Sequence, residues 1–111
     1  MKYETEVKNN VTIIRIKEER LDATVAPELK AQLLVHSKKG DSNVLIDLQD
    51  VDYSDSSGLG AILFGIRQYR ASGMRIKLVN VQPRVLTLIR IAKLDEVVES
   101  FDDEDEALAS Y

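Results

Sequence analysis

The chain has 111 residues, the length of one domain, and its 44% hydrophobic residues can fill one core, which excludes intrinsic disorder. It has no cysteine, which excludes a disulfide scaffold, a thiolate zinc site and a cysteine nucleophile. The net charge is −4, but residues 95–106 hold eight acids and no base, so residues 1–94 carry all 15 bases and only 11 acids. That positive charge is scattered, without the basic run that is typical of nucleic-acid binding.

The first residues of the sequence indicate the cellular compartment of the protein. Residues 1–6 carry charges where a signal peptide has an apolar region, and no stretch approaches the roughly 18 apolar residues of a membrane span. Because cysteine is absent as well, we expect a cytoplasmic protein that forms a single domain over residues 1–111.

A β-hairpin is expected first. Residues 3–8 alternate between the two faces of a strand, and residues 11–16 are β-branched and largely alternating, which is typical of a strand with one face on a core. Asn9 and Asn10 form the turn between them. The first strand should lie at the edge of the sheet.

The spacing of apolar residues then changes to that of a helix. Residues 24–37 are predicted to be helical, with Pro27 in the first turn and Gly40 as the stop. The apolar run after the stop predicts a buried central strand over residues 43–48.

Helical spacing returns near Gly58 and continues to Gly73, and another strand is expected over residues 75–80. Pro83 opens a third helix whose apolar residues cover so much of its surface that we expect neighbours on two sides. Residues 97–98 are expected to add a short last strand.

The acidic C-terminal stretch has two interpretations. It resembles an interaction tail, but Asp102, Asp103 and Glu104 also stand where a helix favours caps and negative charge. We favour a capped helix over residues 103–110. The whole order, strand-strand-helix-strand-helix-strand-helix-(strand)-helix, predicts an α/β fold with a mixed sheet of four or five strands packed with about four helices.

Polar and small residues crowd residues 52–60, between the buried strand and the next helix, where ligands of α/β proteins often bind. Ser56 or Ser57 is expected to cap that helix, whose free N–H groups favour an anion. Gly58 and Gly60 each lower helicity by about 1 kcal/mol relative to Ala. We therefore expect close approach by a partner's backbone or by a neighbouring helix, and the sequence favours neither.

The segment Asp-Ser-Ser-Gly-Leu-Gly at residues 55–60 resembles the signature of the STAS domains of bacterial anti-sigma factor antagonists. The resemblance extends over nearly the whole chain. Tyr53 and Ser54 are more polar than the residues usual before the signature, and Lys93 replaces a glycine that is common in the family. The resemblance implies that a partner binds the surface formed by Asp55, Ser56, Ser57, Gly58 and Leu59.

The resemblance also implies a regulator and not an enzyme. Such an antagonist binds an anti-sigma factor, itself an ATP-dependent serine kinase, and so releases the sigma factor. The kinase phosphorylates the second serine of the signature, here Ser57, and a PP2C-like phosphatase removes the phosphate. No cofactor, metal or catalytic residue is implied.

The charge change explains such a switch. A phosphate adds about −1.5 to −2 charges at pH 7, and near Asp52 and Asp55 it would repel an acidic partner surface and disturb a close-packed interface. The fold should change little, because a phosphate is favourable at a helix N-terminus. Ser57→Ala should cost about 1 kcal/mol if Ser57 is the cap.

Other functions remain as alternatives. The main one is a non-switching STAS docking module of a transporter or a stress-signalling scaffold, in which Ser57 is only a helix cap. Asp50 and Asp52 loosely resemble the aspartates of aspartate-nucleophile phosphatases, but the lysine and the acidic metal site are not evident. A serine hydrolase is disfavoured because the motif is not Gly-x-Ser-x-Gly and the one histidine, His36, lies near a helix end.

Overall fold

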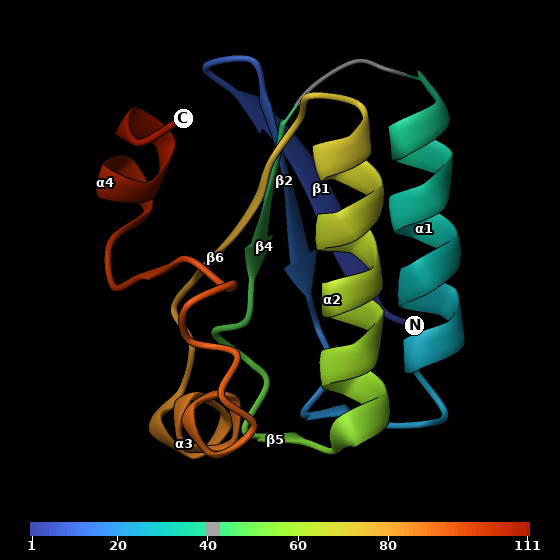
Figure 1. Cartoon of the computed structure of the whole chain (residues 1–111), viewed down its shortest axis with the longest axis vertical. Coiled ribbons are helices and arrows are strands. Elements are labelled where there is room, and N and C mark those ends of the chain that lie inside the picture. The colour runs from blue at the N-terminus through green and yellow to red at the C-terminus, as the bar shows by residue number, and fades with distance from the viewer. Residues whose placement is uncertain (40–42) are drawn as a thin grey trace.

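Figure 1 shows the computed structural model, which describes residues 1–39 and 43–111. A five-stranded sheet in the order β1-β2-β4-β6-β7 is accompanied by a two-stranded sheet of β3 and β5. The strands are β1 (Tyr3–Lys8), β2 (Val11–Ile16), β3 (Arg20–Leu21), β4 (Asn43–Asp47), β5 (Tyr53–Ser54), β6 (Ile76–Val79) and β7 (Ser100–Phe101). The helices are α1 (Ala26–Lys39), α2 (Ser56–Ala71), α3 (Pro83–Ile91) and α4 (Glu104–Ala109).

The main sheet is mixed, as predicted. β1 and β2 pair antiparallel, whereas β2, β4, β6 and β7 are parallel neighbours. Asn9 and Asn10 turn the hairpin with φ of 53° and 62°, a left-handed conformation that Asn tolerates better than most residues. The α/β class, the hairpin and the edge position of β1 are therefore confirmed.

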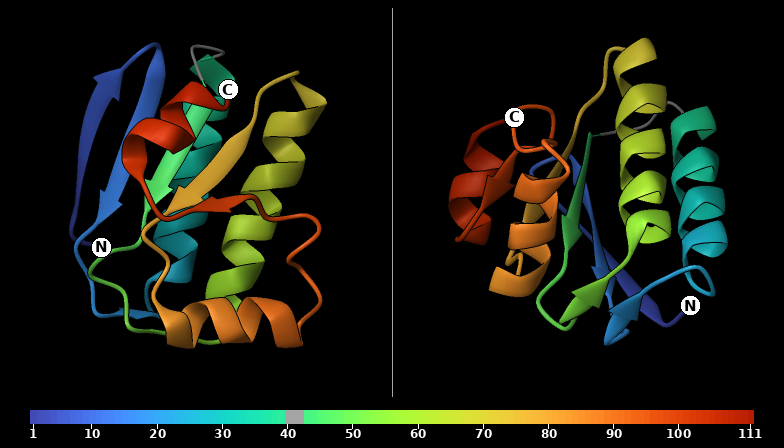
Figure 2. Two further views of the ribbon diagram at one scale, coloured as in Figure 1. Left: turned by 90° about the vertical axis from the view of Figure 1, so that its left-hand side faces the viewer. Right: turned by 60° about the horizontal axis from the view of Figure 1, so that its bottom comes forward.

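The faces of β2 differ from the expectation. Ile14 and Ile16 belong to the main core, which α1 and α2 cover, but Val11 and Ile13 are also buried, in a second core with Leu108 of α4. Figure 2 shows α4 on the opposite side of the sheet from α1 and α2. The expected single buried face is wrong because the short C-terminal helix covers the other face.

α1 and α2 lie side by side and begin at the same end of the molecule (Figure 1). At Gly65 of α2, an added Cβ would stand 2.6 Å from Cδ1 of Leu33 in α1. The absence of a side chain there lets the two helices approach closely. The predicted helix over 24–37 is confirmed with its start at Ala26, while the expected stop at Gly40 lies outside the described residues.

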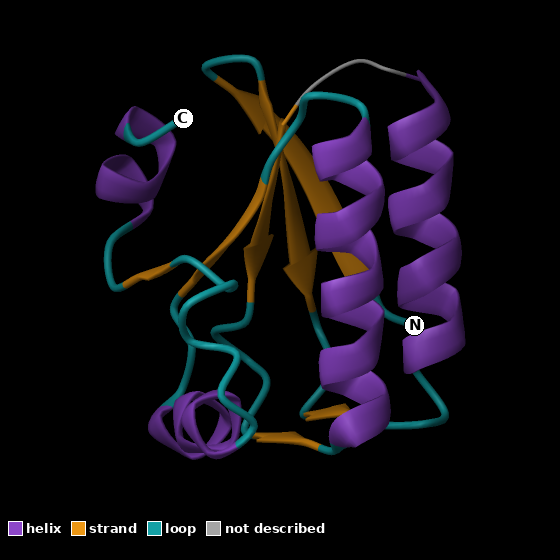
Figure 3. Cartoon of the chain, viewed as in Figure 1, coloured by secondary structure: helices purple, strands orange, loops and turns teal. Residues whose placement is uncertain are grey.

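α3 lies at the lower end of the molecule, where Figure 3 shows it end-on, and its residues are buried on one side only. Val85 and Ile89 are its buried residues, whereas Ile91 is 72% exposed. The expectation of neighbours on two sides is therefore wrong.

The last strand of the chain lies later in the sequence than predicted. The strand expected over residues 97–98 does not form, because the N–H groups of Val97 and Val98 both donate to the carbonyl of Leu94 in a turn. The edge strand is instead β7, which pairs parallel with β6. The terminal helix is confirmed as α4, with Asp103 as its N-cap. Among the described residues, no helix is long and apolar enough to span a membrane.

Candidate functional site

The small sheet of β3 and β5, which sequence periodicity did not reveal, positions the start of α2. Leu21 pairs with Ser54, and the N–H of Asp55 donates to the carbonyl of Leu21 at 3.4 Å. The chain therefore reaches Asp55 still extended, at φ −108° and ψ −174°, and turns into the helix at Ser56. Two-residue strands are too short to show an alternating pattern.

Asp55 caps α2. Its carboxylate Oδ1 accepts the N–H of Gly58 at 3.0 Å, the bond that an N-cap residue makes to the first turn. The expected cap by Ser56 or Ser57 is therefore wrong. All three side chains can cap a helix, and the anchoring of Asp55 to β3 decides which one stands at the boundary.

Ser56 and Ser57 occupy the first turn and are both exposed. Within the described chain, neither hydroxyl makes a hydrogen bond. Both hydroxyls are open to solvent and to an approaching protein, and neither serves the capping of the helix.

Position 58 requires a glycine because of a contact within the chain itself. A Cβ at this position would stand 2.1 Å from the carbonyl oxygen of Leu21 and 2.5 Å from Oγ of Ser54. The hydroxyl of Ser54 itself donates to that carbonyl at 3.1 Å. Neither of the two expected reasons applies to Gly58, because the close neighbour is a strand of the same chain. At Gly60, by contrast, an added Cβ would meet nothing within 4 Å.

The five residues of the expected partner surface differ in exposure. Ser56 and Ser57 are exposed and Asp55 is half-buried, but Gly58 and Leu59 are buried, with Leu59 at 6%. Leu59 packs in the main core and so anchors the first turn of α2. The structure thus gathers three of these side chains at the surface and places the other two beneath them.

A groove of about 320 Å³ lies between the first turns of α1 and α2. It brings together small residues, one serine and one lysine from segments that are distant in sequence. Its lining consists of Ala23, Ala26, Pro27, Lys30, Ser57 and Gly60. Lys30 is not among the predicted site residues, because a single lysine on a helix is an ordinary surface residue until the neighbouring helix is placed.

The loop before α1 is ordered by charged contacts. The guanidinium of Arg20 lies 4.0 Å from the centroid of the Tyr53 ring, and its Nε is 3.4 Å from Oδ2 of Asp22. Asp22 also accepts hydrogen bonds from the hydroxyl and the N–H of Thr24, at 2.6 and 3.0 Å. These bonds hold the pKa of Asp22 below its usual value, and the bond from the Thr24 hydroxyl has the largest effect.

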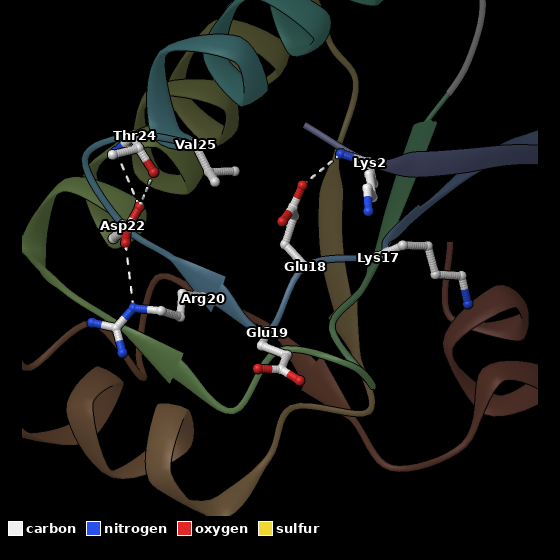
Figure 4. Close-up of a pocket in the computed structure, with 8 residues that line it drawn as sticks. All are labelled: Lys2, Lys17, Glu18, Glu19, Arg20, Asp22, Thr24 and Val25. Atoms are coloured by element: carbon white, nitrogen blue, oxygen red, sulfur yellow. Dashed lines mark hydrogen bonds and ion pairs between the residues drawn. The ribbon is translucent and has the colours of Figure 1, made fainter.

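These contacts border a second, wider hollow of about 460 Å³, drawn in Figure 4. Glu18 accepts the backbone N–H of Lys2 at 2.7 Å across it. Three basic and three acidic side chains line the hollow, so it favours no sign of ligand charge. They are Lys2, Lys17, Arg20, Glu18, Glu19 and Asp22.

The residues behind the enzyme alternatives lie apart. His36 stands ten residues into α1, about 15 Å along the axis from the end where Ser57 lies. Asp50 makes an ion pair with Lys17 at 3.6 Å. In the described residues, no group of three His, Cys, Asp or Glu side chains could hold a metal ion. Arg67 is exposed farther along α2.

The chain is similar to known proteins over nearly its full length. Residues 2–107 match the family model described as the STAS domain. The anti-sigma-B factor antagonist of Bacillus subtilis is 29% identical over 100 residues, which cover 89% of this chain and 91% of that protein.

Solved structures share the fold. An anti-sigma-factor antagonist (STAS) domain protein from Planctomyces limnophilus superposes with a TM-score of 0.86 at 22% identity, over 97% of this chain and 96% of that one. The Bacillus cell fate determinant SpoIIAA in its phosphorylated form gives a TM-score of 0.74 at 22% identity, over 98% of both chains.

Proposed function

Because the chain belongs to the STAS domain family, we propose that it is an anti-sigma factor antagonist that switches partners through phosphorylation of Ser57. The unmodified form binds an anti-sigma factor with serine kinase activity, and the sigma factor is released. The phosphorylated form does not bind, and a PP2C-like phosphatase restores the unmodified form. The chain acts in the cytoplasm as a binding module and not as an enzyme, without cofactor or metal.

One observation carries the proposal. The Ser57 hydroxyl is exposed on a helix turn that is fixed from below by the cap of Asp55 and the burial of Leu59. A kinase must reach its acceptor hydroxyl in a defined position, and a binding partner needs a preformed surface. A protein of the same fold has been solved in a phosphorylated form, which is consistent with regulation of this fold by phosphorylation.

The modification is a phosphoryl transfer. The γ-phosphoryl group of ATP passes to Oγ of Ser57, a new O–P bond forms, ADP leaves, and the hydroxyl proton passes to a base of the kinase. The product carries about −1.5 to −2 charges at pH 7. Asp52 is exposed and Asp55 is half-buried in the same segment, so the added charge concentrates negative potential on the surface that the partner contacts.

Asp55 and the buried pair Gly58 and Leu59 act as positioning residues in this proposal. Asp55 makes the cap that fixes the first turn of α2, and Gly58 lets the turn rest on β3. The direct contacts to the partner come from Ser56, Ser57 and the exposed part of Asp55.

A binding comparison tests the switch. Wild type, Ser57→Ala and Ser57→Asp are used as baits in lysate of the source organism, and retained proteins are identified by mass spectrometry. We expect wild type and Ser57→Ala to retain an ATP-binding serine kinase that Ser57→Asp loses. Ser57→Ala should also keep its free energy of unfolding within about 0.5 kcal/mol, because Asp55 and not Ser57 caps the helix.

The control charge is placed at the other end of the same helix. Ser72 is the exposed C-cap of α2, so Ser72→Asp adds the same charge away from the site and should leave binding unchanged. Incubating the retained kinase with ATP should place a phosphate on the peptide that contains Ser57. If all baits retain the same transporter or scaffold subunits, Ser57 is not the switch and the non-switching docking module is the better assignment.

A further inference from the structure

Resting on the proposed phosphorylation of Ser57, we infer that the phosphate lies in the groove between the first turns of α1 and α2 and pairs there with Lys30. Lys30 is thus an intramolecular receptor for the modification, and the phosphate fills a groove that is open in the unmodified protein. The switch then acts by closing a docking groove as well as by adding charge.

The lining of the groove supports this placement. Ser57 and Lys30 reach it from two different helices, and Lys30 is the only charged side chain among the residues that line it. Ala23, Ala26 and Gly60 leave its floor without long side chains. A Cβ at Gly60 would meet nothing within 4 Å, so internal packing does not account for that glycine.

Lys30 is available for such a pair. Among the described residues it makes no ion pair, and its Nζ lies 5.4 Å from the centroid of the Phe64 ring of α2. This cation–π contact turns the ammonium toward α2, and Lys30 is itself one of the residues that line the groove. A phosphate has three strong acceptor oxygens, so it can bind this ammonium in preference to the ring.

The pair has a consequence for the partner. In the unmodified chain the groove is about 320 Å³ of open surface beside Ser57, with a positive charge at its wall. An acidic side chain of the anti-sigma factor would satisfy Lys30 in that state. A phosphate on Ser57 takes the same ammonium, so partner and phosphate compete for one cation.

The test needs no partner. Full-length protein with phosphoserine installed at position 57 during synthesis is titrated by ³¹P NMR, alone and with Lys30→Met, Lys30→Arg or Arg67→Met. A nearby cation favours the doubly charged phosphate, so Lys30→Met should raise the second phosphate pKa by about half a unit from its wild-type value. Lys30→Arg should keep the wild-type value, since it retains the charge. Amide signals of the first turn of α1 should also shift on phosphorylation.

Arg67→Met is the matched control. It removes one exposed cation from α2, about 15 Å farther along the helix, and should leave the phosphate pKa at the wild-type value. Asp52 and Asp55 are present in every variant, so their effects on the phosphate pKa cancel in the comparison. The inference is overturned if Lys30→Met and wild type share one phosphate pKa, or if Arg67→Met shifts it equally.

The two proposals fail separately. A phosphate pKa that depends on Lys30, together with baits that retain no kinase, would contradict the regulatory function and leave the groove pair standing. Loss of kinase binding in Ser57→Asp, together with a phosphate pKa that ignores Lys30, would leave the switch standing and contradict the groove pair.

Discussion

Two glycines of α2 that are separated by a single residue serve different purposes. Gly58 faces the backbone of β3, where an added Cβ would stand 2.1 Å from the carbonyl of Leu21. Gly60 faces the open groove, where an added Cβ would meet nothing within 4 Å. The first glycine is needed by the fold, and the second leaves space beside Ser57.

Gly58→Ala and Gly60→Ala should therefore change stability in opposite directions. Ala is favoured over Gly in a helix by about 1 kcal/mol, so Gly60→Ala should raise the free energy of unfolding by up to about that amount. Gly58→Ala should lower it by about 1–3 kcal/mol, because a backbone atom must move. Urea unfolding followed by circular dichroism measures both. Equal changes in the two variants would contradict the packing of Gly58 on β3.

At the scale of elements, α4 is the part that depends most on its surroundings. Six residues are too few for a stable isolated helix. The helix is held by burial of Leu108 against the sheet and by a charged network around Arg15. Arg15 Nη1 lies 2.7 Å from Oε1 of Glu104 and 2.8 Å from Oδ2 of the buried Asp47, and Lys8 Nζ lies 2.9 Å from Glu104 Oε2.

The network predicts a pH dependence. Hydrogen bonds from Arg15 first and then Lys8 hold the pKa of Glu104 below its usual value. The stability that Glu104 contributes is therefore fully present above the unfolded pKa of about 4.3 and is lost as the pH falls through the lower folded pKa. Glu104→Gln should lower the free energy of unfolding by about 1 kcal/mol at pH 7 and flatten its acid dependence.

The control lies on the same helix. Glu106 is exposed and, within the described chain, makes no ion pair, so Glu106→Gln should keep the wild-type acid dependence of stability. Urea titrations at several pH values between about 3 and 7 compare the three proteins. A Glu104→Gln variant whose stability falls with acid as steeply as wild type would contradict the network.

At the scale of the whole molecule, the sheet is the shared wall of two cores. The larger core lies under α1 and α2, and the smaller core joins Val11, Ile13, Leu45 and Val79 to α4. Because β2 and β4 contribute to both faces, loss of either core exposes the same strands. We therefore expect one cooperative unfolding transition, as is usual for a domain of this size.

Leu108→Ala tests this coupling. It removes a 7%-exposed side chain from the smaller core and should lower the free energy of unfolding by about 2–5 kcal/mol. Far-UV circular dichroism and tyrosine fluorescence should still report one midpoint. Ile91→Ala, at a position that is 72% exposed, should stay within about 0.5 kcal/mol of wild type. Two separate midpoints in Leu108→Ala would show that α4 unfolds on its own.

Much of the fold and part of the site follow from local patterns in the sequence. The hairpin turn, the central strand, the two long helices and the capped terminal helix depend on apolar spacing and turn residues within a few positions. The signature at residues 55–60 likewise identified the family, because its small and polar residues are contiguous, and it predicts Ser57 as the phosphate acceptor.

Only the tertiary structure decided the features that join distant segments. Asp55 caps α2 because Leu21 anchors it, and β2 is buried twice because α4 returns to the sheet. Lys30 becomes a neighbour of Ser57 only when α1 lies beside α2. Local spacing reports which face of an element is apolar, but the partner of that face is chosen by packing over the whole chain.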